Sequence, residues 1–304
     1  VTSRERLNLR GEWAIEVEGL PTQENDPSAV ELFVQSARRT SANFVADKTH
    51  LPHIIRICQL VNGMPLGIEM AAAWTHVMSC AEIAAEIERD LNFLDSNLRD
   101  MPERHRSLRA VFDHSWRLLT SAEQQTLSQL AVFQGGFTRE AATAVTNASL
   151  SSLSSLVDKS LLRRELNGRY NIHKILRQYA SDQIDNYDAV TARYAQYYLQ
   201  QIASLSADLR GAKQREALEV ISGEMENIRA SWRWGVAYGD AASLTRAMES
   251  LYTVYEIRSW YPEAVEVFRA TAEKFADTEH ELLWCQAMAR HGWFCYRITQ
   301  YDTA

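Results

Sequence analysis

The residue with the clearest capacity for chemistry is His173, within the stretch from Arg163 to Tyr179. Asn167-Gly168 separates two short runs of alternating apolar and polar residues, which predicts a two-residue hairpin turn. A helical pattern begins directly after Ile172, so His173 is expected at the junction of hairpin and helix. An imidazole with a pKa of ~6.5 can donate a hydrogen bond to a phosphate, which would then raise that pKa. The alternative is a histidine that is simply hydrogen-bonded in a domain interface.

Two further positions, Gly63 and Pro65, lie between two predicted helices. Glycine lets a backbone approach closely, and a proline ring has no N–H to leave unsatisfied against a base, so the pair suits a nucleotide. A glycine that ends one helix and a proline that starts the next are also ordinary helix boundaries. Arg4 follows Thr2-Ser3 at the end of an expected strand, and taken alone it is typical of an exposed strand-end arginine.

The spacing of the other reactive side chains predicts neither a metal site nor an acid–base pair. Cys58, Cys80, Cys285 and Cys295 show no Cys-x-x-Cys spacing and no suitable histidine, so we expect reduced, buried cysteines in a cytoplasmic protein. The acidic residues from Glu82 to Asp90 are expected to form the solvated face of a capped helix. Five tryptophans of the tail are expected to pack between helical repeats or to line a concave groove: Trp232, Trp234, Trp260, Trp284 and Trp293.

The elements that would position these residues are predicted to be mainly helical. A period of two at Trp13, Ile15 and Val17 predicts one short strand, and Asp26-Pro27 predicts a helix start. Three helices of a small bundle should then follow, opened by Pro52, by Pro65 and by a capping box of Ser79 and Glu82.

A second helical group precedes the hairpin. Four amphipathic helices are predicted, near 108–119, after a cap at Ser121, after a cap at Thr138, and near 150–157, with a break at Gly135-Gly136. Three short helices followed by a hairpin are typical of a winged helix. The predicted recognition helix, Ser149 to Asp158, contains no lysine or arginine, which disfavours DNA binding because phosphate neutralisation dominates affinity. Arg163, Arg164 and Arg169 on the wing are a partial counterweight.

Beyond Tyr187 the chain is predicted to be helical to its end, with turns near Gly211, Gly223, Gly239-Asp240 and Tyr261-Pro262. Tyr261 to Ala264 and Tyr301 to Ala304 match at the aromatic residue and the alanine. Ala264 and Phe268 also have the Ala-x-x-x-Phe spacing of a tetratricopeptide-like helix. We therefore expect an array of helical pairs.

Composition sets the broad class. The chain has 304 residues, 46% hydrophobic and 23% charged, which indicates an ordinary globular protein of about two domains. A net charge of -7 argues against a dedicated polyanion binder. No stretch reaches the roughly 20 apolar residues of a membrane span, and no signal peptide is visible. The chain starts at Val1 and stops at Ala304 within a restarting pattern, so we expect a piece of a longer protein.

Taken in order, these features resemble the STAND regulatory ATPases with an NB-ARC-type nucleotide module. The chain resembles bacterial regulators of the SARP and LuxR type still more closely. The similar stretches are Val1 to Leu7, Gly63 to Leu66, Phe133 to Phe137, Leu156 to Leu162 and Ile172-His173.

The resemblance implies four domains. They are the end of a P-loop NTPase α/β domain (1–40), a helical ARC1-like subdomain (41–100), a winged-helix ARC2-like subdomain (101–187) and tetratricopeptide-like repeats (188–304). It implies that Arg4 faces the terminal phosphate, that Gly63 and Pro65 lie beside adenine, and that His173 holds the β-phosphate of ADP in a closed, inactive state. No Gly-x-x-x-x-Gly-Lys-[Ser/Thr] loop and no magnesium-binding acidic strand end occur, so catalysis by this chain alone is not expected.

The predicted function is therefore regulatory. ADP and ATP are the implied ligands, with magnesium only where a phosphate loop is present. A protein or small inducer would bind the repeats, and ATP would favour an oligomerising form. Direct DNA binding and membrane binding by this chain are not expected. Two rivals stay open: a helical interaction scaffold without nucleotide, and a transcription factor whose winged helix binds DNA.

Overall fold

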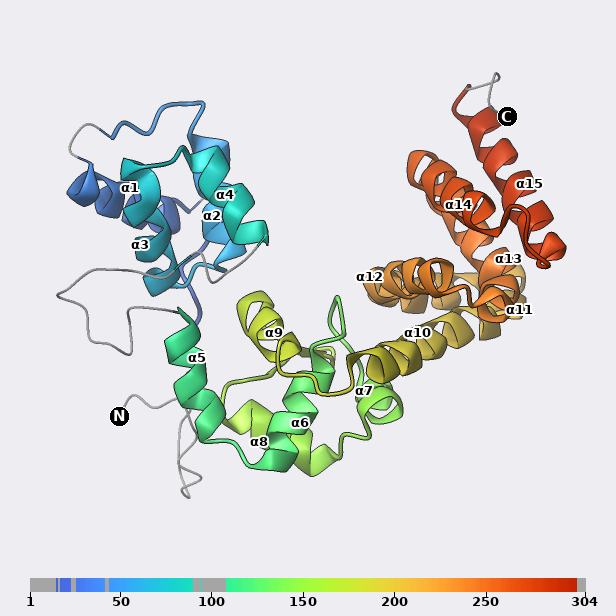
Figure 1. The fold of residues 1–304 in the computed structure, drawn as a ribbon, viewed down its shortest axis with the longest axis horizontal. Helices are drawn as coiled ribbons and strands as arrows, with labels where there is room; N and C mark the ends of the chain where they lie inside the picture. Colours follow the sequence, from blue (N-terminus) through green and yellow to red (C-terminus); the bar gives the residue numbers. More distant parts are fainter. Residues whose placement is uncertain are drawn as a thin grey trace. The chain divides into compact units, whose positions relative to one another are not determined.

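The computed structural model describes residues 15, 17–22, 26–41, 44–89, 94 and 108–299. Over these residues the chain is mainly α-helical, as predicted (Figure 1). It divides into two compact units. Unit 1 comprises Val1–Ala131, Ser149–Arg164 and Ile172–Ile184, and unit 2 comprises Val132–Ala148, Glu165–Asn171 and Asp185–Ala304. The segment 101–187, predicted as one winged helix, therefore contributes to both units.

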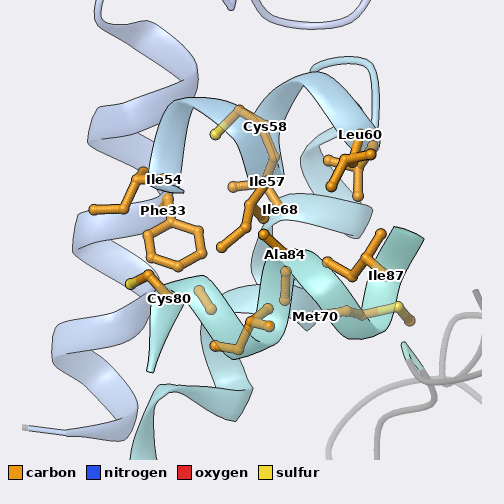
Figure 2. Packing of buried hydrophobic residues seen from close by; sticks show 14 of the residues in the cluster. Phe33, Ile54, Ile57, Cys58, Leu60, Ile68, Met70, Cys80, Ala84 and Ile87 are labelled. Atoms are coloured by element: carbon orange, nitrogen blue, oxygen red, sulfur yellow. The ribbon is translucent and has the colours of Figure 1, made fainter. Parts of the chain in front are cut away.

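The first helices of unit 1 surround a hydrophobic core. They are α1 (Ser28–Thr40), α2 (Leu51–Leu60), α3 (Pro65–Ala73), the short 3₁₀ helix η1 (Trp74–His76) and α4 (Cys80–Arg89). Figure 2 shows Phe33 of α1 meeting Ile57 of α2 and Ile68 of α3, with Ala84 of α4 closing the cluster. α1 thus shares its core with helices of the region 41–100.

Local signals start these helices much as predicted. The Asp26 carboxylate accepts from the Ser28 backbone N–H at 3.1 Å, and α1 begins at Ser28. Ser79 and Glu82 form the predicted reciprocal capping box, with the Glu82 carboxylate 2.8 Å from the Ser79 backbone nitrogen. Pro65 is the first residue of α3, where its missing N–H leaves nothing unsatisfied.

Unit 1 also contains three helices of the second group, α5 (Leu108–Arg117), α6 (Ser121–Leu130) and α8 (Leu150–Asp158), and the helix after the hairpin, α9 (Lys174–Ser181). α6 packs on α8 and α9, and the Tyr179 hydroxyl on α9 donates to Asp113 on α5 at 2.6 Å. The cap predicted at Ser121 is wrong by one residue. Thr120 is the N-cap, because its side chain and that of Glu123 form a second capping box.

The hairpin lies where predicted, but its turn differs. β1 (Arg163–Arg164) and β2 (Tyr170–Asn171) form a two-stranded sheet. The loop has three residues, since the Gly168 N–H donates to the Glu165 carbonyl and only Gly168 has a positive φ, +84°. Asn167 instead keeps a negative φ and accepts from the Arg169 N–H at 2.9 Å, which stabilises this longer turn.

The strand predicted around Trp13 is not seen at the two of its residues that the structure describes. Ile15 and Val17 belong to no strand and are 87% and 92% exposed. Trp13 itself lies outside the described residues. A strand needs a neighbour for its backbone groups, and no described segment pairs with this one.

Unit 2 contains α7 (Arg139–Thr146) and the helices of the tail: α10 (Tyr187–Ser204), α11 (Ser206–Arg210), α12 (Gln214–Tyr238), α13 (Ala241–Arg258), α14 (Tyr261–Phe275) and α15 (Glu281–Arg297). α10 packs on α12 and α13, and α14 lies beside α15 (Figure 1). Turns between helices occur near Gly211, Gly239 and Tyr261, as predicted. The turn predicted at Gly223 is wrong, because Gly223 lies inside α12.

The other predictions about side chains hold in part. Cys58, Cys80 and Cys295 are buried and free, whereas Cys285 is exposed. Trp232 is buried between helices, while Trp284 and Trp293 are exposed on α15. No group of three or more metal-binding side chains occurs in the described ranges. Among the helices that the structure describes, none combines the length and apolarity required to cross a membrane.

Candidate functional site

His173 lies at the predicted junction and has a defined local role. It is the N-cap of α9, and its Nδ1 accepts from the Ile175 backbone N–H at 3.2 Å. Because Nδ1 is an acceptor, the proton of the neutral ring is on Nε2. The ring therefore has one donor, Nε2–H, for a further partner.

Burial keeps this imidazole neutral. Desolvation lowers the pKa of His173 below its ordinary value of 6.5. A phosphate would act in the opposite direction, since it stabilises the cation. In the protein without a ligand, the site therefore presents a neutral hydrogen-bond donor.

Gly63 is explained by the backbone around it. Its φ is +66°, its N–H donates to the Cys58 carbonyl at 2.8 Å, and its own carbonyl accepts from the Leu20 N–H at 2.8 Å. A Cβ at Gly63 would lie 1.9 Å from the Leu20 carbonyl oxygen. Both main-chain groups of Gly63 are therefore in use, and the close approach that glycine permits is made by the backbone of Leu20.

Pro65 is open to solvent. Its ring is exposed at the first position of α3, and no side chain caps that helix. The leading amides of a helix have no intrahelical partner, so the free N–H groups at the start of α3 can donate hydrogen bonds to a ligand.

His173 and Pro65 are connected through one hydrophobic core. Ile175, two residues after His173, is buried in the core of α1 to α4. Met64 and Leu66, on either side of Pro65, pack against that same core. The two predicted ligand residues thus lie beside neighbours that share one core in unit 1.

Positive charge gathers at the start of α9, which the sequence analysis did not identify. The pKa of Lys174 is lowered first by burial and then by the charge of Arg56 on α2. Arg56 pairs with Glu88 on α4, with 2.8 Å between Nε and Oε1. The one available sequence signal was Lys174, directly after His173; Arg56 looks like any exposed helix residue. Arg4, the fourth predicted ligand residue, lies outside the described residues.

The predicted recognition helix offers little to DNA. Ser149 caps α8, and Lys159, directly after this helix, donates to Glu123 at 2.7 and 2.8 Å. On the hairpin, Arg163 pairs with Glu18 and Arg169 with the buried Glu224. These cations are therefore partly or fully neutralised within the protein.

Comparison with known proteins finds relatives that are named as transcriptional regulators. The chain is 32% identical over 286 residues to a protein of Mycobacterium tuberculosis called "Putative HTH-type transcriptional regulator". The same identity is found with a protein of the same description in Mycobacterium bovis. The match takes in 90% of this chain but only 32% of either relative, so the chain spans about a third of their length. No protein-family model matches the chain.

Two other comparisons add less. An uncharacterized protein of Mycobacterium tuberculosis is 34% identical over 213 residues, which is 66% of this chain and 53% of that protein. A solved structure of a STAND protein with a tetratricopeptide repeat sensor, from Pyrococcus horikoshii, is 13% identical with a TM-score of 0.31. It covers 93% of this chain and 42% of its own. A TM-score this low does not establish a shared fold.

Proposed function

We propose that this chain is the regulatory part of a nucleotide-switched transcriptional regulator. In this proposal Pro65 and the N-terminus of α3 hold the adenine of ADP, and the Nε2–H of His173 donates to its β-phosphate. The helices α10 to α15 form the sensor that an inducer binds. ADP release would then allow ATP to favour an active form, because the nucleotide binds the two domain arrangements with different affinities.

One observation carries the nucleotide part of the proposal. Ile175 beside His173 and Met64 and Leu66 beside Pro65 pack into the same core, which supports placing both residues in the same part of unit 1. Lys174 adds a positive charge at the start of α9, which favours a phosphate there, whereas the charge of the nearby Arg56 is balanced by Glu88. The names of the relatives support the regulatory part, and those names concern proteins about three times as long as this chain.

Calorimetric titration of the full-length protein with ADP tests the proposal. We expect His173→Ala to weaken ADP binding roughly tenfold, since one hydrogen bond to a charged group contributes about 1.5 kcal/mol or more. The regulatory activity of the full-length protein in the absence of inducer should rise in the same variant. His173→Asn should show the same loss of affinity while its side chain still caps α9, which separates loss of the ligand contact from loss of the cap.

His53→Ala is the matched control, because His53 is an exposed histidine on α2. Its ADP affinity should equal that of the wild type. Unchanged ADP affinity and unchanged basal activity in His173→Ala would refute the role of His173. A wild-type protein that binds no ADP would favour the rival function, a helical scaffold without nucleotide.

A further inference from the structure

A polar cluster is buried inside unit 2, where the hairpin loop meets α12. Arg169 donates through Nη1 and Nη2 to the two carboxylate oxygens of Glu224, and through Nη2 to the Gly136 carbonyl at 2.5 Å. Glu224 is only 3% exposed. Paired donors of a guanidinium fix both distance and orientation, so the hairpin loop is held on α12 in one geometry.

Asn227, one turn further along α12, completes the cluster. Its Nδ2 donates to Glu224 and to the Gly136 carbonyl, both at 3.0 Å. Its Oδ1 accepts from the backbone N–H of Gln134 at 3.0 Å and from the Tyr194 hydroxyl at 3.1 Å. One side chain therefore joins α12 to α10 and to the segment before α7.

Two glycines lie beside Arg169. A Cβ at Gly136 would lie 3.5 Å from Nε of Arg169 and 3.2 Å from the Tyr170 carbonyl oxygen, so the tight contact is with the backbone of β2. A Cβ at Gly223, inside α12, would lie 3.8 Å from Nη1 of Arg169, which is an ordinary van der Waals distance. The guanidinium therefore does not require a glycine at position 223.

The same stretch of α12 also holds α14. Arg229 donates through Nε and Nη2 to the two carboxylate oxygens of Glu263, both at 2.6 Å. The indole Nε1–H of Trp232 donates to Thr271 Oγ1 at 3.0 Å. From Glu224 to Trp232 is about 12 Å of helix at 1.5 Å per residue. A short, regular piece of α12 thus contacts the hairpin loop at one end and α14 at the other.

We propose that the cluster of Arg169, Glu224 and Asn227 is a coupling element that transmits displacement of α14, through α12, to the hairpin loop. The loop continues through β2 to His173, two residues beyond Asn171. An inducer that shifts α14 on α12 would thereby act on β2, the strand that precedes His173 in the chain. Any consequence for nucleotide binding rests on the proposed function, whereas the coupling inside unit 2 does not.

The polar chemistry of the cluster suits this role. A buried ion pair stabilises a protein little more than apolar residues of similar size would, but breaking it leaves an uncompensated charge. The connection therefore tolerates few intermediate arrangements.

A double-variant experiment on the full-length protein, without nucleotide, tests the coupling. Thr271→Val removes the acceptor of Trp232 with little change of shape. We expect hydrogen exchange in the loop 165–171 to rise at least threefold in Thr271→Val. In a Glu224→Gln background, where the loop already exchanges faster, Thr271→Val should add no further increase.

Thr245→Val is the matched control, because Thr245 Oγ1 bonds only within its own helix, to the Ala241 carbonyl at 2.7 Å. It should leave exchange in the loop unchanged. If Glu224→Gln does not fold, Arg169→Lys serves as the second background, since it keeps the charge and loses the paired donors.

Two results would overturn the coupling: no effect of Thr271→Val on the loop, or an equal effect in both backgrounds. Titration with ADP distinguishes this failure from failure of the proposed function. Coupled exchange with no ADP binding would leave the coupling element standing and reject the nucleotide role. ADP binding that depends on His173, with uncoupled exchange, would do the reverse.

Discussion

At the scale of single residues, Gly63 gives the sharpest prediction. Gly63→Ala should reduce the local stability of unit 1 by about 2 to 5 kcal/mol, from the left-handed φ and from overpacking. The added Cβ would meet the Leu20 carbonyl oxygen at 1.9 Å, and a backbone atom cannot rotate away. Hydrogen exchange within α2 measures this loss as a free energy of opening.

Gly239→Ala provides the control for Gly63→Ala. Gly239 has a φ of +76°, but nothing lies within 4 Å of an added Cβ. Only the cost of a left-handed φ for alanine should destabilise this variant, by about 1 to 2 kcal/mol. Hydrogen exchange within α13 measures this loss. Equal losses in the two variants would show that the Leu20 contact contributes nothing.

The residues of the candidate site differ in how far the sequence could predict them. The boundary role of Gly63 and Pro65 follows from local chemistry: Gly63 lies after the end of α2, and Pro65 is the first residue of α3. The contact of Gly63 with Leu20 is tertiary, and no pattern announced it. Glu224 and Asn227 were missed because polar residues suggest a solvated face. Their spacing with the apolar Ile221 and Ile228 on one helical face was the available signal.

At the scale of elements, Glu123 connects two helices of unit 1. It closes the capping box of α6 with Thr120 and also accepts from Ser155 and Lys159 at the far end of α8. Burial acts to raise the pKa of Glu123, but these hydrogen bonds outweigh it and lower the pKa from 4.5 to about 2. The ionised carboxylate is therefore the form that holds α6 on α8.

The sign of the pH dependence follows from this lowered pKa. The folded protein binds the proton of Glu123 less readily than the unfolded chain, so the stabilisation is fully present above about pH 4.5. It is lost as the pH falls toward about 2, and it amounts to about 3 kcal/mol. Glu123→Gln should be less stable at pH 7 by about that amount, with a flatter stability curve between pH 4.5 and 2, as measured by urea unfolding.

Glu82→Gln is the matched control for Glu123→Gln. Glu82 forms the same capping box with Ser79 but is exposed, with no described contact to a second helix. Glu82→Gln should lose much less free energy of unfolding than Glu123→Gln. The fall in stability of the wild type between pH 4.5 and 2 should remain in this variant. An unaltered acid dependence in Glu123→Gln would show that another carboxylate is responsible.

The elements themselves were predictable where short-range chemistry decides them. The side chains of Thr138 and Ser149 cap α7 and α8 through hydrogen bonds. In α2 and α3 a proline lies within the first two helical residues. The hairpin turn was predicted one residue too short because the Asn167 side chain selects a different turn. Gly223 was predicted as a turn because glycine commonly marks a turn, but the helical pattern continues past it and α12 runs on to Tyr238.

At the scale of the whole molecule, the distribution of charge bears on the prediction that this chain does not bind DNA directly. The chain carries 39 acidic and 32 basic residues. The cations that a winged helix would offer to phosphates have carboxylate partners instead: Lys159 with Glu123, Arg163 with Glu18 and Arg169 with Glu224. On the hairpin, among the residues that the structure describes, only Arg164 has no such partner. One free arginine contributes little to affinity, because each phosphate neutralised adds one increment.

Charge reversal on the hairpin tests this distribution. We expect Arg163→Glu with Arg164→Glu to leave any DNA affinity of the full-length protein unchanged within about twofold, and the salt dependence of binding unaltered. Arg169 is unsuitable for this test, because a glutamate there would bury a second negative charge beside Glu224 and disrupt unit 2. A shift assay over a range of salt concentrations measures both quantities. A loss of affinity together with a shallower salt slope would mean that the hairpin contacts phosphates, and the winged helix would then regain the role of a DNA reader.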